Sequence, residues 1–155
     1  MTDDKPAGRP RSLAHVALRV RNLDRSVAFY TDVVGLKLRH RTGGPAFLGN
    51  REDTSHELAL FPLAADAPSP DPSHVGMYHM AWEMDSFEEL QRLHQRLLDN
   101  GVRITGYSEV QSNVMFYDPD GNELEAIWEP SKEELARAKE SGQPLPRLEQ
   151  ASLTS

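Results

Sequence analysis

The sequence predicts an α+β fold built from two repeated modules, each made of one strand, one helix and three further strands. Two matching segments support this prediction, because residues 13–18 and 77–82 each place a histidine, His15 or His79, early in a predicted strand. Each segment leads into a helical pattern that stops at a glycine, and three short apolar runs follow each helix. We therefore expect a single duplicated domain over residues 12–130.

The first module, residues 12–63, opens with a strand over residues 12–20, which alternate and are rich in Leu and Val. The alternation places His15 on the face opposite the aliphatic Val16 and Leu18, so the aliphatic face can pack under a helix. Helical spacing, a glycine at the helix end and a Gly-Gly-Pro turn predict the other elements. They are a helix at 23–34 and strands at 36–41, 45–49 and 57–63.

The second module, residues 76–130, repeats this order after a proline-rich linker over residues 64–73. We expect Asp85 to cap its helix, with Glu88 three residues further on. His94 is expected on an exposed face of this helix. The predicted elements are a strand at 76–84, the helix at 86–100 and strands at 102–110, 113–117 and 123–129.

Both ends of the chain are predicted to lie outside the repeat. Residues 1–11 are polar, with two prolines and a glycine, and are expected to form a flexible arm. Ser131 and Glu134 form a capping-box pattern, which predicts a short C-terminal helix over residues 131–139. Residues 143–155 are expected to be a mobile tail.

The composition excludes several classes of function. A net charge of −7 argues against nucleic acid as a partner, because binding its backbone needs clustered Lys and Arg. No apolar run approaches the roughly 18–20 residues of a membrane helix, and no signal-peptide core is visible, so we expect a cytoplasmic protein without a membrane partner. The chain has no cysteine, so a bound metal must be held by His, Asp and Glu. Such ligands suit Fe(II), Mn(II), Ni(II), Co(II) or an open Zn(II) site.

The repeat, the histidine in the first strand of each half and one turn together resemble the vicinal oxygen chelate superfamily. The turn is Asp118-Pro119-Asp120-Gly121-Asn122, and it leads through Leu124 to Glu125. This superfamily includes glyoxalase I, fosfomycin-resistance proteins, methylmalonyl-CoA epimerase, bleomycin-binding proteins and type I extradiol ring-cleaving dioxygenases. The resemblance covers residues 12–130 and implies that the two modules form a cup-shaped, curved mixed sheet.

The resemblance also implies the metal ligands, which would be His15, His79 and Glu125. Alternation after Glu123 brings Glu125 to the same strand face. Two histidines and one carboxylate with open positions suit non-haem Fe(II), which must bind both substrate and O2. Fe(II) is therefore the expected cofactor. A homodimer is also expected, because single-module members of the superfamily commonly pair.

The strand that begins at His56 and Glu57 separates two versions of the site. In glyoxalase I and the epimerase this strand supplies a fourth metal ligand, for which Glu57 is the candidate. In extradiol dioxygenases it resembles His-x-Leu/Val-Ala-Phe/Leu, the histidine is the acid–base catalyst, and the metal has three protein ligands. The run from His56 to Leu60 resembles the second pattern. Alternation points His56 and Glu57 to opposite faces, so both cannot enter the cup unless the strand is bulged.

The resemblance therefore predicts an extradiol-type dioxygenase that cleaves a small catecholic aromatic with O2, with His56 as general base and then general acid. The expected pocket residues are Phe47, Leu58, Met115 and Tyr117. Met115 is a departure, because extradiol enzymes usually carry a tyrosine at the matching position. The alternatives are a glyoxalase- or epimerase-type lyase or isomerase, and a non-catalytic binding protein of the bleomycin-resistance kind.

Overall fold

Two four-stranded sheets, one from each predicted module, form the computed structural model of this chain, which describes residues 8–108 and 111–150. The strand order is β1-β4-β3-β2 in the first sheet and β5-β8-β7-β6 in the second. This shared order confirms the predicted α+β repeat. The strands are β1 (Val16–Val20), β2 (Leu38–Arg41), β3 (Ala46–Leu48), β4 (Leu58–Pro62), β5 (His79–Glu83), β6 (Ile104–Gly106), β7 (Ser112–Tyr117) and β8 (Glu123–Trp128).

The helix of the first module has two parts. It starts as α1 (Leu23–Ala28), where the Asn22 side chain accepts a hydrogen bond from the Arg25 backbone N–H, and continues as a π-helix, η1 (Phe29–Val34). It ends at Gly35, whose φ of 96° lies in the left-handed region that favours glycine. The predicted helix is therefore confirmed, with a wider final turn.

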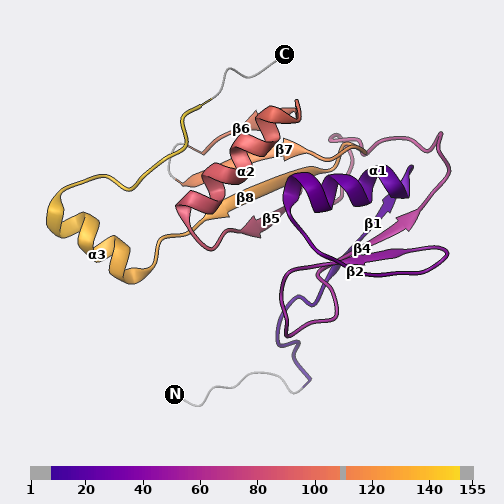
Figure 1. Cartoon of the computed structure of the whole chain (residues 1–155), viewed down its shortest axis with the longest axis horizontal. Coiled ribbons are helices and arrows are strands. Elements are labelled where there is room, and N and C mark those ends of the chain that lie inside the picture. Colours follow the sequence, from indigo (N-terminus) through magenta and orange to yellow (C-terminus); the bar gives the residue numbers. More distant parts are fainter. Residues whose placement is uncertain (1–7, 109–110, 151–155) are drawn as a thin grey trace.

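The helix of the second module is α2 (Phe87–Asp99). Its N-cap is Ser86, whose hydroxyl accepts a hydrogen bond from the Glu89 N–H, so the expected cap at Asp85 is wrong by one residue. Figure 1 shows α2 crossing β7 and β8, with α1 beside it. The two helices lie next to each other, and α2 contacts η1 directly.

One hydrophobic core joins the two modules. Alternate residues of the strands face the helices, so Leu18 and Val20 of β1 and Leu124 and Ala126 of β8 are all buried. A single shared core means that the two modules fold as one unit rather than as two independent domains.

Buried carboxylates of the Asp-Pro-Asp-Gly-Asn turn also hold the modules together. Asp120 accepts hydrogen bonds from the Arg21 side chain at 2.8 Å and from the Ser26 hydroxyl at 3.2 Å. Asp118 accepts a hydrogen bond from the Tyr30 hydroxyl at 2.9 Å. Burial, together with the negative charge of Asp118, raises the pKa of Tyr30 well above its usual value. The turn that marks the sequence therefore ties the second module to the first helix.

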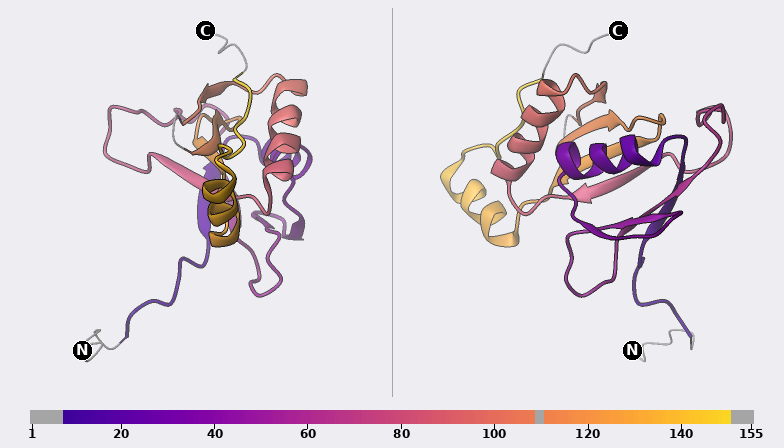
Figure 2. Two further views of the ribbon diagram at one scale, coloured as in Figure 1. Left: turned by 90° about the vertical axis from the view of Figure 1, so that its left-hand side faces the viewer. Right: turned by 45° about the vertical axis from the view of Figure 1, so that its right-hand side comes forward.

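The C-terminal helix α3 (Lys132–Ser141) has the predicted capping box at Ser131, and it projects from the side of the sheets (Figure 2). The segment after α3 packs against the rest of the protein. This corrects the expectation of a mobile tail for residues 143–150, which are the part of the tail that the structure describes. Leu145 and Leu148 pack against the core, and the Ser112 hydroxyl donates to the Pro146 carbonyl at 2.6 Å. Residues 1–7 of the expected arm and 151–155 of the tail lie outside the described residues. No helix in the described part of the chain is long and apolar enough to cross a membrane.

Candidate metal and substrate site

The helices pack against one face of each sheet, and we call the other face the open face. Strand register and alternation decide which side chains lie on it. The open face of the first sheet carries His15, Ala17, Arg19, His40, Phe47, Ala59 and Phe61. That of the second carries His79, Ala81, Glu83, Asn113, Met115, Tyr117, Glu123 and Glu125.

Two of the three predicted metal ligands lie together on the second open face. His79 Nε2 is 3.2 Å from Glu125 Oε2, and the Glu125 side chain is only 10% exposed. His79 Nδ1 is buried and has no hydrogen-bond partner in the described part of the chain. One imidazole nitrogen and one carboxylate oxygen that converge in this way fit the donors preferred by a divalent transition metal.

Asn113 holds the second oxygen of Glu125. Its side-chain Nδ2 donates to Glu125 Oε1, and its Oδ1 accepts from the Ser108 backbone N–H at 2.6 Å. Asn113 is itself buried. Sequence reasoning missed this residue, although it lies on the same strand face as Met115 by alternation. Hydrogen bonds of this kind commonly orient carboxylates that bind metals.

The third predicted ligand, His15, lies on the other open face beside His56. The two imidazole rings have centroids 4.6 Å apart, and the Phe47 ring is 4.9 Å from that of His56. The Ser55 hydroxyl lies 2.8 Å from His56 Nδ1, which leaves Nε2 free of that contact. Burial, with a smaller contribution from His15, lowers the pKa of His56 below its usual value, which favours a neutral ring.

Glu57 points into the loop that precedes its strand. Its Oε2 accepts hydrogen bonds from the backbone N–H groups of Asn50 at 2.7 Å and Arg51 at 2.9 Å. The Glu57 carboxylate therefore holds the loop at Asn50 and Arg51, whereas the neighbouring His56 faces His15. Only one of these two side chains was expected to enter the cup. A bend before β4 begins lets His56 face His15, while Glu57 points into the loop.

The repeat identifies the position in the first module that matches Glu125. In the second module Glu125 pairs with Ala81, two residues after His79. In the first module the residue that pairs with Ala17, two residues after His15, is Ala59. An alanine side chain cannot bind a metal, so the first module contributes no carboxylate at the equivalent position.

The predicted three ligands do not meet within one chain. Among the described residues, no three His, Cys, Asp or Glu side chains lie close enough together to hold a metal ion. His15 with His56 forms one half of the predicted site, and His79 with Glu125 forms the other half.

Three of the four predicted pocket residues lie on the open faces, and the fourth, Leu58, does not. Leu58 was expected to line the pocket, but it is fully buried in the hydrophobic core, because β4 begins at this residue with its side chain toward the helices. Phe47 lies on the first open face. Met115 pairs directly with Glu125 on the second. Tyr117 lies on that face too, with the Arg103 guanidinium 5.2 Å from its ring centroid.

His94 was expected on an exposed helix face, and it is buried instead. Its Nε2 lies 2.9 Å from the Tyr107 hydroxyl, and burial lowers its pKa. Its spacing could have revealed this position, because His94 follows Phe87 by seven residues and Leu90 by four, and both of those side chains are buried.

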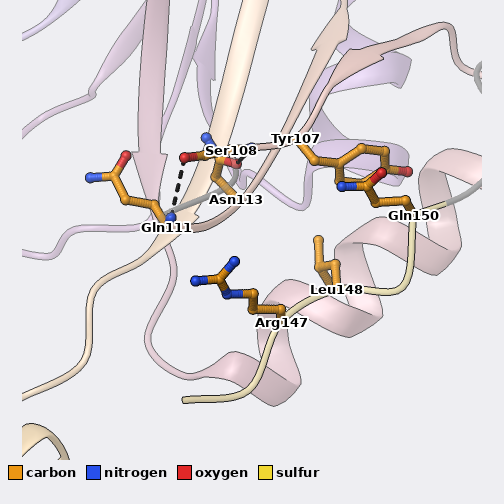
Figure 3. Close-up of a pocket in the computed structure, with 7 residues that line it drawn as sticks. All are labelled: Tyr107, Ser108, Gln111, Asn113, Arg147, Leu148 and Gln150. Atoms are coloured by element: carbon orange, nitrogen blue, oxygen red, sulfur yellow. Dashed lines mark hydrogen bonds between the residues drawn. The ribbon is translucent and has the colours of Figure 1, made fainter. Parts of the chain in front are cut away.

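Two pockets lie away from the predicted ligands. The smaller, of about 390 Å³, lies between the β6–β7 connection and the C-terminal segment, with Arg147 pointing into it (Figure 3). Asn113, whose side chain donates to Glu125, is one of the residues that line this pocket. The larger, of about 820 Å³, lies between Trp128, α3 and the C-terminal segment.

Known proteins of several activities are similar to this chain. A catechol-2,3-dioxygenase of Bacillus subtilis is 29% identical over 118 residues, which are 73% of this chain but only 40% of that enzyme. A lactoylglutathione lyase of Salmonella typhimurium is 31% identical over 126 residues, covering 74% of this chain and 90% of the lyase. The chain thus spans less than half the length of the dioxygenase.

The fold also matches solved structures. A glyoxalase/dioxygenase from Nostoc punctiforme superposes with a TM-score of 0.69 at 23% identity, over 84% of this chain and 99% of that one. A sequence model of one superfamily matches residues 12–126, which include both open faces. The chain therefore belongs to the Glyoxalase/Bleomycin resistance protein/Dioxygenase superfamily.

Proposed function

We propose that this protein is an Fe(II)-dependent, extradiol-type dioxygenase that opens the ring of a catecholic aromatic. The observation that carries the proposal is the pairing of Ala17 with Ala59, which leaves no carboxylate at the position equivalent to Glu125. A site with three protein ligands keeps open positions for a substrate with two adjacent oxygens and for O2. The similarity to a catechol-2,3-dioxygenase supports the same activity.

The metal ligands in this proposal are His15, His79 and Glu125. Bound Fe(II) would supply coordination of both substrate oxygens and of O2, and electron transfer between them. Mn(II), Ni(II), Co(II) and Zn(II) suit the same donors, so the iron assignment rests on the proposed reaction. Asn113 fixes the direction of the Glu125 carboxylate through its hydrogen bond.

His56 is the acid–base residue of the proposal. Its contact with the Ser55 hydroxyl engages Nδ1, so Nε2 can take the proton of a catechol hydroxyl and later return it to the oxygen that becomes part of the product. Phe47 lies against the His56 ring and limits its rotation. Met115 stands opposite Glu125 and has no hydroxyl, so the substrate receives no hydrogen bond from that position.

A homodimer completes the site in this proposal. A twofold axis can set His15 and His56 of one protomer against His79 and Glu125 of the other, and this contact forms twice. Charge supports the pairing, because residues 12–63 contain seven Lys and Arg against five Asp and Glu, whereas residues 76–130 contain three against eleven. Opposite net charges on the two modules favour contact between unlike halves over contact between like halves.

Anaerobic loading with Fe(II), followed by a panel of catechols and a record of O2 uptake, tests the function. We expect uptake with the wild type and a loss of about 10²- to 10⁴-fold in His56→Ala, which removes the acid–base group. Glu57→Gln is the matched control and should keep its activity. An absence of uptake with every catechol would exclude the proposed reaction.

A lyase or isomerase of the glyoxalase type is the second candidate. The supporting observation is that the chain covers 90% of the lactoylglutathione lyase at 31% identity. This version needs Glu57 to leave its loop and become a fourth ligand, so Glu57→Gln should then lose bound metal and activity with Ni(II), Co(II) or Zn(II). Purified protein that never retains stoichiometric metal would instead favour the metal-free binding protein.

A further inference from the structure

One positive side chain on the first open face has no partner among the described residues of its own protomer. Arg19 is exposed and makes no hydrogen bond or ion pair with any described residue. Other arginines of this module are engaged, and their ion pairs join Arg21 with Asp120, Arg41 with Asp24 and Arg51 with Asp53. An unpaired guanidinium on the same face as a candidate ligand is available to bind a group from outside the chain.

The side chain between His15 and Arg19 on this strand face is small. Ala17 is exposed at the middle of the strip between them, and its partner across β1 and β4 is Ala59, whose side chain is buried. His15 stands at one end of the strip, and Arg19 stands at the other. A planar ring can lie over the exposed Ala17, because its methyl group does not project far from the sheet.

Aromatic side chains border the same strip. Phe61 pairs with Arg19, and Phe47 pairs with Ala59 from the other side. The Phe47 ring lies 6.4 Å from that of Phe61, edge to face, and 6.2 Å from that of His40, nearly parallel. These rings offer apolar contacts to an aromatic ligand, while Arg19 offers a charge-assisted hydrogen bond at the end away from the histidine.

The length of the strip limits what the ligand is. Arg19 follows His15 by four residues, so their Cα atoms are about 13 Å apart along an extended strand. The long arginine side chain can lean back over part of this distance. A ligand that reaches from the metal ligands to the guanidinium therefore needs an aromatic ring plus a short side chain that ends in an anion.

We infer that Arg19 binds a carboxylate on the side chain of the substrate, so the preferred substrate is an anionic catechol rather than a neutral one. The catechol part rests on the proposed function, and the carboxylate part rests on Arg19 alone. The chain has a net charge of −7, which repels anions at long range, but the module that carries Arg19 has an excess of positive residues. The bidentate geometry of guanidinium suits a carboxylate.

Selectivity between two substrates tests the inference. KM is measured for catechol and for a catechol that carries a carboxymethyl group, with wild type, Arg19→Gln and Arg19→Lys. Arg19→Gln should raise KM for the carboxylated substrate by about 10- to 100-fold and change that for catechol by no more than about twofold, because only one charge-assisted contact is lost. Arg19→Lys should recover part of the difference. Arg92→Gln removes a positive charge from the exposed side of α2 and should change neither KM.

A binding measurement separates this inference from the ring-cleavage proposal. Calorimetry of metal-free wild type and Arg19→Gln with phenylacetate, which has the ring and the carboxylate but no hydroxyls, needs no turnover. If no catechol is cleaved but phenylacetate binding depends on Arg19, the anion site stands and the dioxygenase proposal fails. If wild type does not bind phenylacetate, Arg19 is not the anion site. The same conclusion follows if wild type and Arg19→Gln bind it equally and show the same ratio of KM for catechol to KM for the carboxylated catechol.

Discussion

Asn113 shows how a single residue can decide whether a carboxylate is ready to bind a metal. Its Nδ2 engages one oxygen of Glu125, and this leaves the other oxygen facing His79. Without that hydrogen bond, the Glu125 side chain would have to be ordered when the metal binds, at a cost in conformational entropy. Asn113 is therefore a positioning residue of the proposed site, because it acts through Glu125.

We predict that Asn113→Ala weakens binding of Fe(II) or Co(II) by about 10- to 100-fold, as expected when an outer partner of a ligand is lost. Competition with a chromophoric chelator under anaerobic conditions measures the affinity. Gln95→Ala on the exposed side of α2 is the control and should bind metal as the wild type does. Equal affinity in Asn113→Ala would mean that Glu125 is held in place by its other neighbours.

His94 gives a pH dependence that is separate from the metal site. Burial lowers its pKa in the folded protein, whereas the unfolded chain should titrate near the usual value of 6.5. The unfolded state therefore takes up the proton first, so stability is full above about pH 6.5 and falls as the pH drops toward the lowered folded pKa. Urea unfolding at several pH values should show a smaller loss on acidification in His94→Gln than in wild type. An identical loss in both proteins would contradict this role for His94.

At the scale of strands and helices, the period of each element predicted which side chains share a face, but only within the element. Alternation correctly put Glu125 on the same face as Glu123. It failed at Leu58, because β4 begins there and the preceding residues bend, so His56 and Leu58 point to opposite sides despite their even spacing. The docked segment at Leu145 was missed because one or two apolar residues among prolines give no periodic signal.

The turn at Asp120 should contribute strongly to stability, because it connects two elements of different modules. Its carboxylate is nearly buried and receives hydrogen bonds from Arg21 and Ser26, so Asp120→Ala should lower the free energy of unfolding by roughly 2–3 kcal/mol. Asp66→Ala, at an exposed position of the linker, is the control and should change it by less than about 0.5 kcal/mol. Chemical denaturation measures both. A small effect of Asp120→Ala would show that the shared core alone holds the modules together.

At the scale of the whole molecule, the repeat predicted that His15 and His79 are equivalent, and the family resemblance implied that both bind a metal with Glu125. Neither predicted that His15 lies apart from the other two ligands within one chain. Each module is specified by local patterns, whereas the relation of one module to the other depends on contacts such as Tyr30 with Asp118, which are 88 residues apart. Local periodicity carries no information about such distant contacts. The split of His15 from His79 and Glu125 is therefore visible only in three dimensions, and it turns an expected dimer into a requirement of the proposed site.

Mixing two inactive variants tests this requirement. His15→Ala removes a ligand from one half of every site, and Glu125→Ala removes a ligand from the other half. If the two halves come from different protomers, a mixed dimer has one site with both substitutions and one intact site. Equal amounts of the two variants, unfolded together and refolded, should then recover roughly a quarter of wild-type activity, since about half of the dimers are mixed and each has one working site. Metal binding should recover in the same proportion, which keeps the test valid whatever reaction the site performs. If neither activity nor metal binding recovers although the mixed dimer is isolated, His15 and Glu125 belong to the same protomer's site, and the shared-site dimer is wrong.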